Sequence, residues 1–200
     1  MLNMCIKAEG RFMSLTRKSL KFSSKMSHHV KPHKHKWDSF GEHKICTSTK
    51  GLDIIWGNDE RFWKQVQIPK DGACLNYGEG MELIQVCWLE VRGILNLEET
   101  QHLATNKTYE LFYIIKFEVD AFGWDDGPVS LHLVTPDGRK SKRSHNFGEY
   151  KRNEWHKVSG GEFTVGSTIK GNVRYGMYET ETLWWKGGMV LHGVLIEPKK

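Results

Sequence analysis

From residue 45 onward, short runs of β-branched and aromatic residues alternate with turn signals. The clearest run, residues 109–119, places Leu111, Tyr113 and Phe117 on one face, which is the alternation of a β-strand with one buried face. Turn signals containing Asp-Gly follow two of the other runs, and no run has the periodicity of a long helix. The pattern predicts an all-β fold.

The predicted strands occur at regular spacing along the chain. They lie within residues 52–56, 62–68, 81–91, 109–119, 129–134, 162–165, 168–178 and 189–196. About seven or eight short strands with glycine-rich turns are typical of an antiparallel jelly-roll β-sandwich. We expect the C-terminal strand to pair back into a sheet and close the fold.

The N-terminal part of the chain has a different composition. Residues 1–50 hold eleven Lys/Arg and three Asp/Glu, a net charge of +8, which leaves −3 for residues 51–200. We expect a flexible, basic, His/Lys-rich tail over residues 1–44 and one domain over residues 45–200. The tract around His28 and His33 is interpreted as a solvated linker, because it lacks carboxylate or cysteine partners for a metal. No metal or cofactor is expected.

Membrane and secretion signals are absent from the pattern. No apolar run approaches the roughly 20 residues of a membrane span, and charged residues interrupt the start of the chain. This favours a cytoplasmic protein, with a weak match to a transit peptide as the alternative.

The four cysteines show no C-x-x-C spacing, so neither a zinc knuckle nor a dense disulfide framework is indicated. Cys87 is expected to pack within a strand. Cys5 and Cys46, in or beside the tail, are candidates for disulfide cross-links to other proteins.

Two tryptophans flank a polar turn in residues 54–63. The turn is Gly57-Asn58-Asp59, with Trp56 before it and Trp63 after it. Because a pyranose presents C–H groups on its faces and hydroxyls around its edge, indoles beside short polar groups form a suitable sugar site. The alternative is that both indoles are core residues.

Five blocks of the sequence carry a family resemblance. They are residues 54–63, 86–93, 108–113, 154–163 and 185–199, containing for example Ile-Ile-Trp-Gly-Asn-Asp and Trp-Lys-Gly-Gly-Met-Val. In this order, over residues 52–199, they resemble the phloem protein 2 lectins, the Nictaba-like domain of plants, most closely those of cucurbits. The resemblance implies a dimeric jelly roll that binds N-acetylglucosamine oligomers (chito-oligosaccharides) and N-glycan cores without catalysis. It also implies a role in plant defence and a location in phloem sieve-element and companion-cell sap.

The resemblance assigns particular residues to the sugar site. Trp56 and Trp63 match the two sugar-site tryptophans of the family, and Glu179 matches a glutamate of that site. A second family acid falls on Asn172, whose amide is a weaker acceptor than a carboxylate.

Further candidates come from the chemistry that a sugar requires. Asn58 and Asp59 are placed to accept hydroxyl groups, with Glu179 as another acceptor. Trp184, Trp185 and Lys186 are expected to form the niche and rim for an acetamido group, although Trp185 is equally compatible with the core and Lys186 with solvent.

Two other function classes were weighed. A glycosidase would need paired carboxylates, with Glu90 or Glu179 as candidates, but no spacing singles out a pair. RNA binding through the basic tail and residues 139–143 is the second hypothesis, although the acidic body argues against it. Residues 139–143 are interpreted as a solvated loop in preference to a nuclear-import patch.

Overall fold

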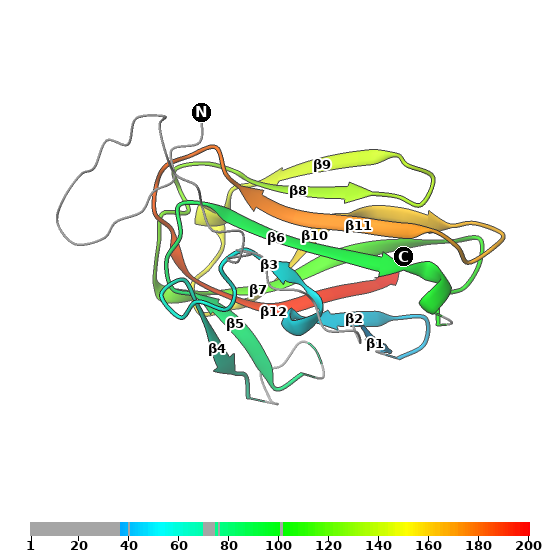
Figure 1. Ribbon diagram of the computed structural model, residues 1–200, viewed down its shortest axis with the longest axis horizontal. Helices are drawn as coiled ribbons and strands as arrows, with labels where there is room; N and C mark the ends of the chain where they lie inside the picture. The colour runs from blue at the N-terminus through cyan, green and yellow to red at the C-terminus, as the bar shows by residue number, and fades with distance from the viewer. Residues whose placement is uncertain (1–36, 40, 70–74, 76, 101) are drawn as a thin grey trace, which may run out of the picture.

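The computed structural model describes residues 37–39, 41–69, 75, 77–100 and 102–200. Two antiparallel β-sheets lie face to face (Figure 1). Helical structure in this part of the chain is limited to three-residue turns: Thr49–Gly51, Leu97–Glu99 and Phe147–Glu149. The predicted all-β, antiparallel jelly-roll sandwich is confirmed.

The smaller sheet has five strands in the order β3-β6-β11-β8-β9. Their bounds are Asp53–Ile54 (β3), Leu89–Asn96 (β6), Asn172–Glu179 (β11), Val129–Val134 (β8) and Lys140–His145 (β9). Alternate residues such as Leu131 and Met177 are fully buried between the sheets. The other half of each strand therefore forms an outer face.

The larger sheet has seven strands and is organised around β12. Its strands are Asp38–Ser39 (β1), Ile45–Ser48 (β2), Trp63–Gln67 (β4), Glu79–Leu83 (β5), Lys107–Phe122 (β7), Trp155–Val165 (β10) and Gly187–Pro198 (β12). Strand β12 pairs with β7 along one side, and with β5 and then β2 along the other. The expected return of the C-terminal strand into a sheet is thus present.

Close approach of two strands explains the glycine at position 193. Gly193 has a φ of +152°, and a Cβ there would lie 2.3 Å from the backbone oxygen of Thr47 in β2. Only glycine tolerates both this φ angle and this close approach. Gly193 therefore allows β12 to pair first with β5 and then with β2.

The predicted strand over residues 81–91 is wrong in its continuity. Strand β5 ends at Leu83 and β6 begins at Leu89, so the chain crosses between the sheets over residues 84–88. Gly93 also does not end β6. The space of its missing Cβ is filled by the ring of Tyr175, whose Cε2 atom would lie 2.2 Å away.

Of the basic residues 139–143, which were interpreted from the sequence as a loop, only Arg139 lies outside a strand. Residues Lys140–His145 form the edge strand β9, with Lys140 and Lys142 exposed. Lysines on an edge strand disfavour pairing with other chains.

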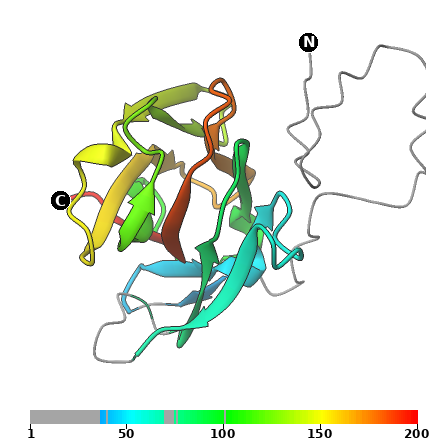
Figure 2. The same ribbon diagram turned by 90° about the vertical axis from the view of Figure 1, so that its left-hand side faces the viewer.

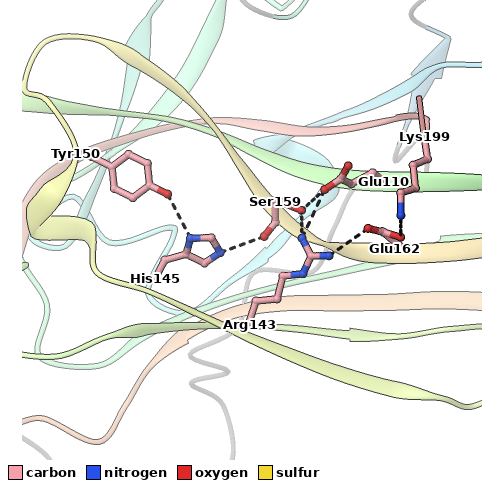
Figure 3. A network of polar contacts seen from close by, with 7 residues as sticks. All are labelled: Glu110, Arg143, His145, Tyr150, Ser159, Glu162 and Lys199. Atoms are coloured by element: carbon pink, nitrogen blue, oxygen red, sulfur yellow. Dashed lines mark hydrogen bonds and ion pairs between the residues drawn. The ribbon is translucent and has the colours of Figure 1, made fainter.

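Arg143 lies on the inner face of β9 and connects this strand of the smaller sheet to the larger sheet (Figure 3). Its guanidinium bonds to Ser159 and pairs with Glu110 at 3.5 Å and Glu162 at 3.3 Å. Glu162 also accepts from Lys199 at 2.7 Å. The network fixes β9 against β7 and β10.

The N-terminal region departs from the expected boundary. Strand β1 lies within the stretch predicted as tail and pairs with β2. Cys46 is 1% exposed in β2, and burial raises the pKa of its thiol, so its expected accessibility for cross-linking is not observed. Cys87 lies in the crossing segment and not in a strand. Residues 1–36, with Cys5 and the His/Lys tract, and Cys74 lie outside the described residues.

Candidate functional site

Three loops meet at one end of the sandwich, which we call the loop end: residues 55–62, 84–88 and 180–186. They lie at the left of Figure 1 and face the viewer in Figure 2. Backbone bonds join them: Ile84 donates to Phe62 at 2.8 Å, and Val86 and Lys186 bond reciprocally at 2.9 and 2.8 Å. Ile55 donates to Glu90 of β6 at 3.1 Å. The three loops therefore form one supported surface.

Each of these loops carries a tryptophan that reaches the surface. Trp184 is 64% exposed and Trp88 is 37% exposed, while Trp56 is partly buried against Phe62 with ring centroids 5.4 Å apart. Trp88 and Trp184 leave the Val86–Lys186 bridge on the same side, because the pairing is antiparallel. Exposed indoles on linked loops are suited to contact a ligand with apolar faces.

Trp63 lies in the core. It is 2% exposed in β4, and its indole N–H has no hydrogen-bond partner among the described residues. Of the two readings of this residue, the structure supports the core residue. The two tryptophans of the motif therefore occupy different environments.

The predicted turn at residues 57–59 is present. Asp59 accepts from Arg61 Nε at 3.0 Å and Nη2 at 2.7 Å, and this side-chain hydrogen bond lowers the pKa of the carboxyl group. Asn58 is exposed. The Asp59 carboxylate is thus already bonded, whereas the Asn58 amide faces solvent.

Glu179 and Lys186 form an ion pair beneath the loop end. Their side chains are 3% and 2% exposed. Lys186 also donates to the backbone oxygen of Trp184 at 2.9 Å and of Cys87 at 3.5 Å, and Glu179 accepts from the Thr182 N–H at 2.9 Å. Lys186 is therefore not at the rim, where we expected it, but holds two of the loops together from within.

Asn172 is not brought to the loop end. It begins β11, which Glu179 ends, and seven residues of strand separate them by about 23 Å. Trp185 is partly buried. Of the predicted residues, the loop end thus carries Trp56, Asn58, Asp59, Trp184 and Trp185, while Glu179 and Lys186 are buried beneath it.

Trp88 lies on this surface but was not among the predicted site residues. Trp88 donates to Glu90 at 3.0 Å, and Glu90 is ion-paired with Arg92 while only 5% exposed. The available signal was the alternation of Trp88, Glu90 and Arg92 on one face. It did not show that Trp88 lies in a loop beside Trp184.

The described residues contain neither a metal-binding cluster nor a membrane-spanning helix. No group of three or more His, Cys, Asp or Glu side chains is arranged to hold a metal ion in the described part of the chain. None of the helices described has the length and apolar character needed to cross a bilayer.

These features define a β-sandwich protein with a tryptophan-bearing loop surface at one end. The profile of the phloem protein 2 family matches residues 42–198, and the chain belongs to this family. The resemblance inferred from the sequence blocks is confirmed.

Several relatives show the extent of the likeness. Protein PHLOEM PROTEIN 2-LIKE A1 of Arabidopsis thaliana is 33% identical over 76% of this chain and 60% of its own length. A protein named "Lectin" of Luffa acutangula is 32% identical over 76% of this chain and 68% of its own. PHLOEM PROTEIN 2-LIKE A9 of A. thaliana is 31% identical over 88% and 98%. The chain spans about 60% of the length of PHLOEM PROTEIN 2-LIKE A1 and A2.

A solved carbohydrate-binding module in complex with β-1,4-galactotriose aligns over 74% of this chain and 87% of its own, with a TM-score of 0.44 and 10% identity. A likeness at that level does not assign a function.

Proposed function

We propose that this protein is a lectin that binds N-acetylglucosamine oligomers and N-glycan cores through the loop end, without catalysis. The observation that carries the proposal is the presence of Trp56, Trp88 and Trp184 on three loops joined by backbone hydrogen bonds. The relative from Luffa acutangula named "Lectin" supports carbohydrate binding as the general function.

The indoles and the polar groups of the loop end contact different parts of the sugar. Trp184 and Trp88 supply apolar plates for the sugar faces and the acetamido methyl group. Asn58 and the peptide groups of the loops supply donors and acceptors for hydroxyls. Glu179 and Lys186 act by positioning the loops, since both charges are used in their own ion pair.

Two carboxylates argue for binding without catalysis. Glu179 lies on the inner face of the sheet opposite Leu89, whereas Glu90 lies on the outer face opposite Tyr178. They point to opposite faces of one sheet, and both are ion-paired. Two carboxyl groups so arranged cannot flank one glycosidic bond, as hydrolysis requires.

The resemblance to the family supports a proposal for the wider setting of this activity. We place the protein in phloem sap with a defence role, acting as a homodimer in which paired shallow sites raise the strength of binding.

Calorimetric titration with the N-acetylglucosamine trimer tests the proposal. We expect saturable heat for the wild type and a loss of affinity of about tenfold or more for Trp184→Ala and Trp88→Ala, because each removes a stacking surface. Ile94→Ala is the matched control, because Ile94 is 48% exposed but lies on the outer face of β6.

Two outcomes of this titration would contradict the proposal. Unchanged affinity in both folded tryptophan variants would remove the binding site from the loop end. Absence of saturable heat for the wild type, with both this trimer and an N-glycan core, would reject the lectin proposal as stated.

A further inference from the structure

The outer face of the five-stranded sheet carries an aromatic ring in an unusual position. Residues 174, 176 and 178 of β11 face outward, opposite the inward-facing Tyr175 and Met177. A Cβ at Gly176 would lie 2.5 Å from Cε2 and Oη of Tyr178. The ring of Tyr178 therefore lies along the sheet over the glycine, and the residue remains partly exposed.

Neighbouring strands complete the surroundings of this ring. The His132 ring of β8 lies 4.8 Å from that of Tyr178. Tyr178, His132, Ser130 and Lys142 line one cavity of about 170 Å³, walled by residues 180–182. This cavity is small compared with the roughly 300–1,000 Å³ of sites for drug-sized ligands. It suits one sugar unit, with the rest of a chain lying on the open sheet.

Cations continue across the face beyond the cavity. The strand register places Arg174 opposite Val134, and Val134 opposite Lys140. Arg174, Lys140 and Lys142 are exposed and form no ion pair within the described residues. Lys140 and Lys142 are two residues apart on one strand, about 7 Å, so successive anionic groups of a linear ligand can each meet a cation.

The residues that line the cavity indicate which chemical groups the ligand carries. Besides the Lys142 ammonium, the wall presents the hydroxyls of Ser130, Thr180 and Thr182 and the exposed carboxylate of Glu181. A carboxylate and three hydroxyls can each bond to sugar hydroxyls, so this wall suits a ligand that is rich in hydroxyl groups. A sugar that also bears a negative charge satisfies the ring, the cations and the carboxylate together.

We propose that the outer face of the five-stranded sheet is a second carbohydrate site that binds oligomers of uronic acids. Tyr178 stacks on one sugar ring, Lys142 pairs with its carboxylate, and Arg174 and Lys140 pair with carboxylates of the following units. The site shares the wall of residues 180–182 with the loop end, but its ring and its cations lie on the strands, and it does not depend on the function proposed for the loop end.

Calorimetric titration with the trimer of α-1,4-linked galacturonic acid tests this site at low salt. We expect saturable binding that weakens as salt is added, and no binding of the same trimer with its carboxylates reduced to alcohols. Lys142→Ala should weaken binding by about tenfold and Tyr178→Ala by about fivefold.

Matched variants separate the site from general effects. Lys142→Arg and Tyr178→Phe should retain binding, because they keep the charge and the ring. Lys64→Ala removes an exposed lysine from β4 of the other sheet, and Trp56→Ala alters the loop end in residues 55–62, which do not line the cavity. Both should bind the acidic trimer as the wild type does. Thermal unfolding of each variant establishes that it is folded.

Four results would overturn the proposal. They are no saturable binding by the wild type, equal binding of the reduced trimer, unchanged affinity in folded Lys142→Ala and Tyr178→Ala, and loss of binding in folded Trp56→Ala. A single-stranded RNA that binds this face while the acidic trimer does not would assign the surface to nucleic acid instead.

Discussion

The ammonium group of Lys186 and the carboxylate of Glu179 pair inside the loop end, where the two side chains are 2% and 3% exposed. The same ammonium reaches the backbone oxygens of Trp184 and Cys87. One buried cation therefore connects β11, the loop of residues 84–88 and the loop that carries the most exposed tryptophan. Its removal should affect both stability and the position of Trp184.

We expect Lys186→Met to destabilise the protein by about 3–5 kcal/mol, because it leaves the Glu179 carboxylate buried without its counter-charge. Combining it with Glu179→Leu should recover much of this loss. Denaturant unfolding of both single variants and the double variant measures the coupling. A coupling energy near zero would show that the pair does not act as a unit.

Substitutions of Trp63 test whether this residue contributes to folding stability or to sugar binding. We expect Trp63→Ala to cost about 3–5 kcal/mol, because it empties a core position. Trp63→Phe should cost less, since the indole N–H that it removes has no partner among the described residues, and it should bind the N-acetylglucosamine trimer normally. Loss of binding in a Trp63→Phe protein of native stability would instead place this residue in the sugar site.

Gly93 tests the packing between β6 and β11. Gly93→Ala should cost about 1–3 kcal/mol, because the new Cβ would lie 2.2 Å from the Tyr175 ring. Gly166→Ala is the control, with no atom within 4 Å of the added Cβ. Equal unfolding midpoints for the two variants would contradict the filling of this space by Tyr175.

His192 predicts a dependence of stability on pH. The ring is 0% exposed in β12 and bonds through Nε2 to the backbone oxygen of Tyr77 at 2.8 Å. Burial lowers the pKa of His192 below its usual 6.5, so the unfolded chain binds more protons than the folded one as pH falls through that region. The stabilising contribution is present above pH 6.5 and is lost as pH falls through the folded-state pKa.

Unfolding free energies measured across this pH range should fall less steeply for His192→Gln than for the wild type. His132→Gln is the comparison, because burial also lowers the pKa of His132 but this ring is exposed on the outer face. A steeper effect of His132→Gln would transfer the pH dependence to the sheet surface.

Much of the fold was predictable because a half-buried strand shows an alternation of apolar and polar residues in its own sequence. Tyr109–Val119 lies within β7 and Met189–Ile196 within β12, as their alternation predicted. The break between β5 and β6 was not visible in the sequence, because residues 84–88 continue the alternation while the chain passes between the sheets. Strand β9 was missed because an edge strand needs only one buried face, and here Arg143 covers it with polar contacts.

The site divides in the same way. The sequence determined the β-sandwich class, the turn at residues 57–59 and membership of the family, since each rests on local residue patterns. Only the tertiary structure decided that Trp63 is buried while Trp184 is exposed, that Lys186 pairs with Glu179, and that Asn172 lies at the far end of β11. These properties depend on which distant segments come into contact, and pairing between segments far apart in the chain is not encoded in the period of either segment alone.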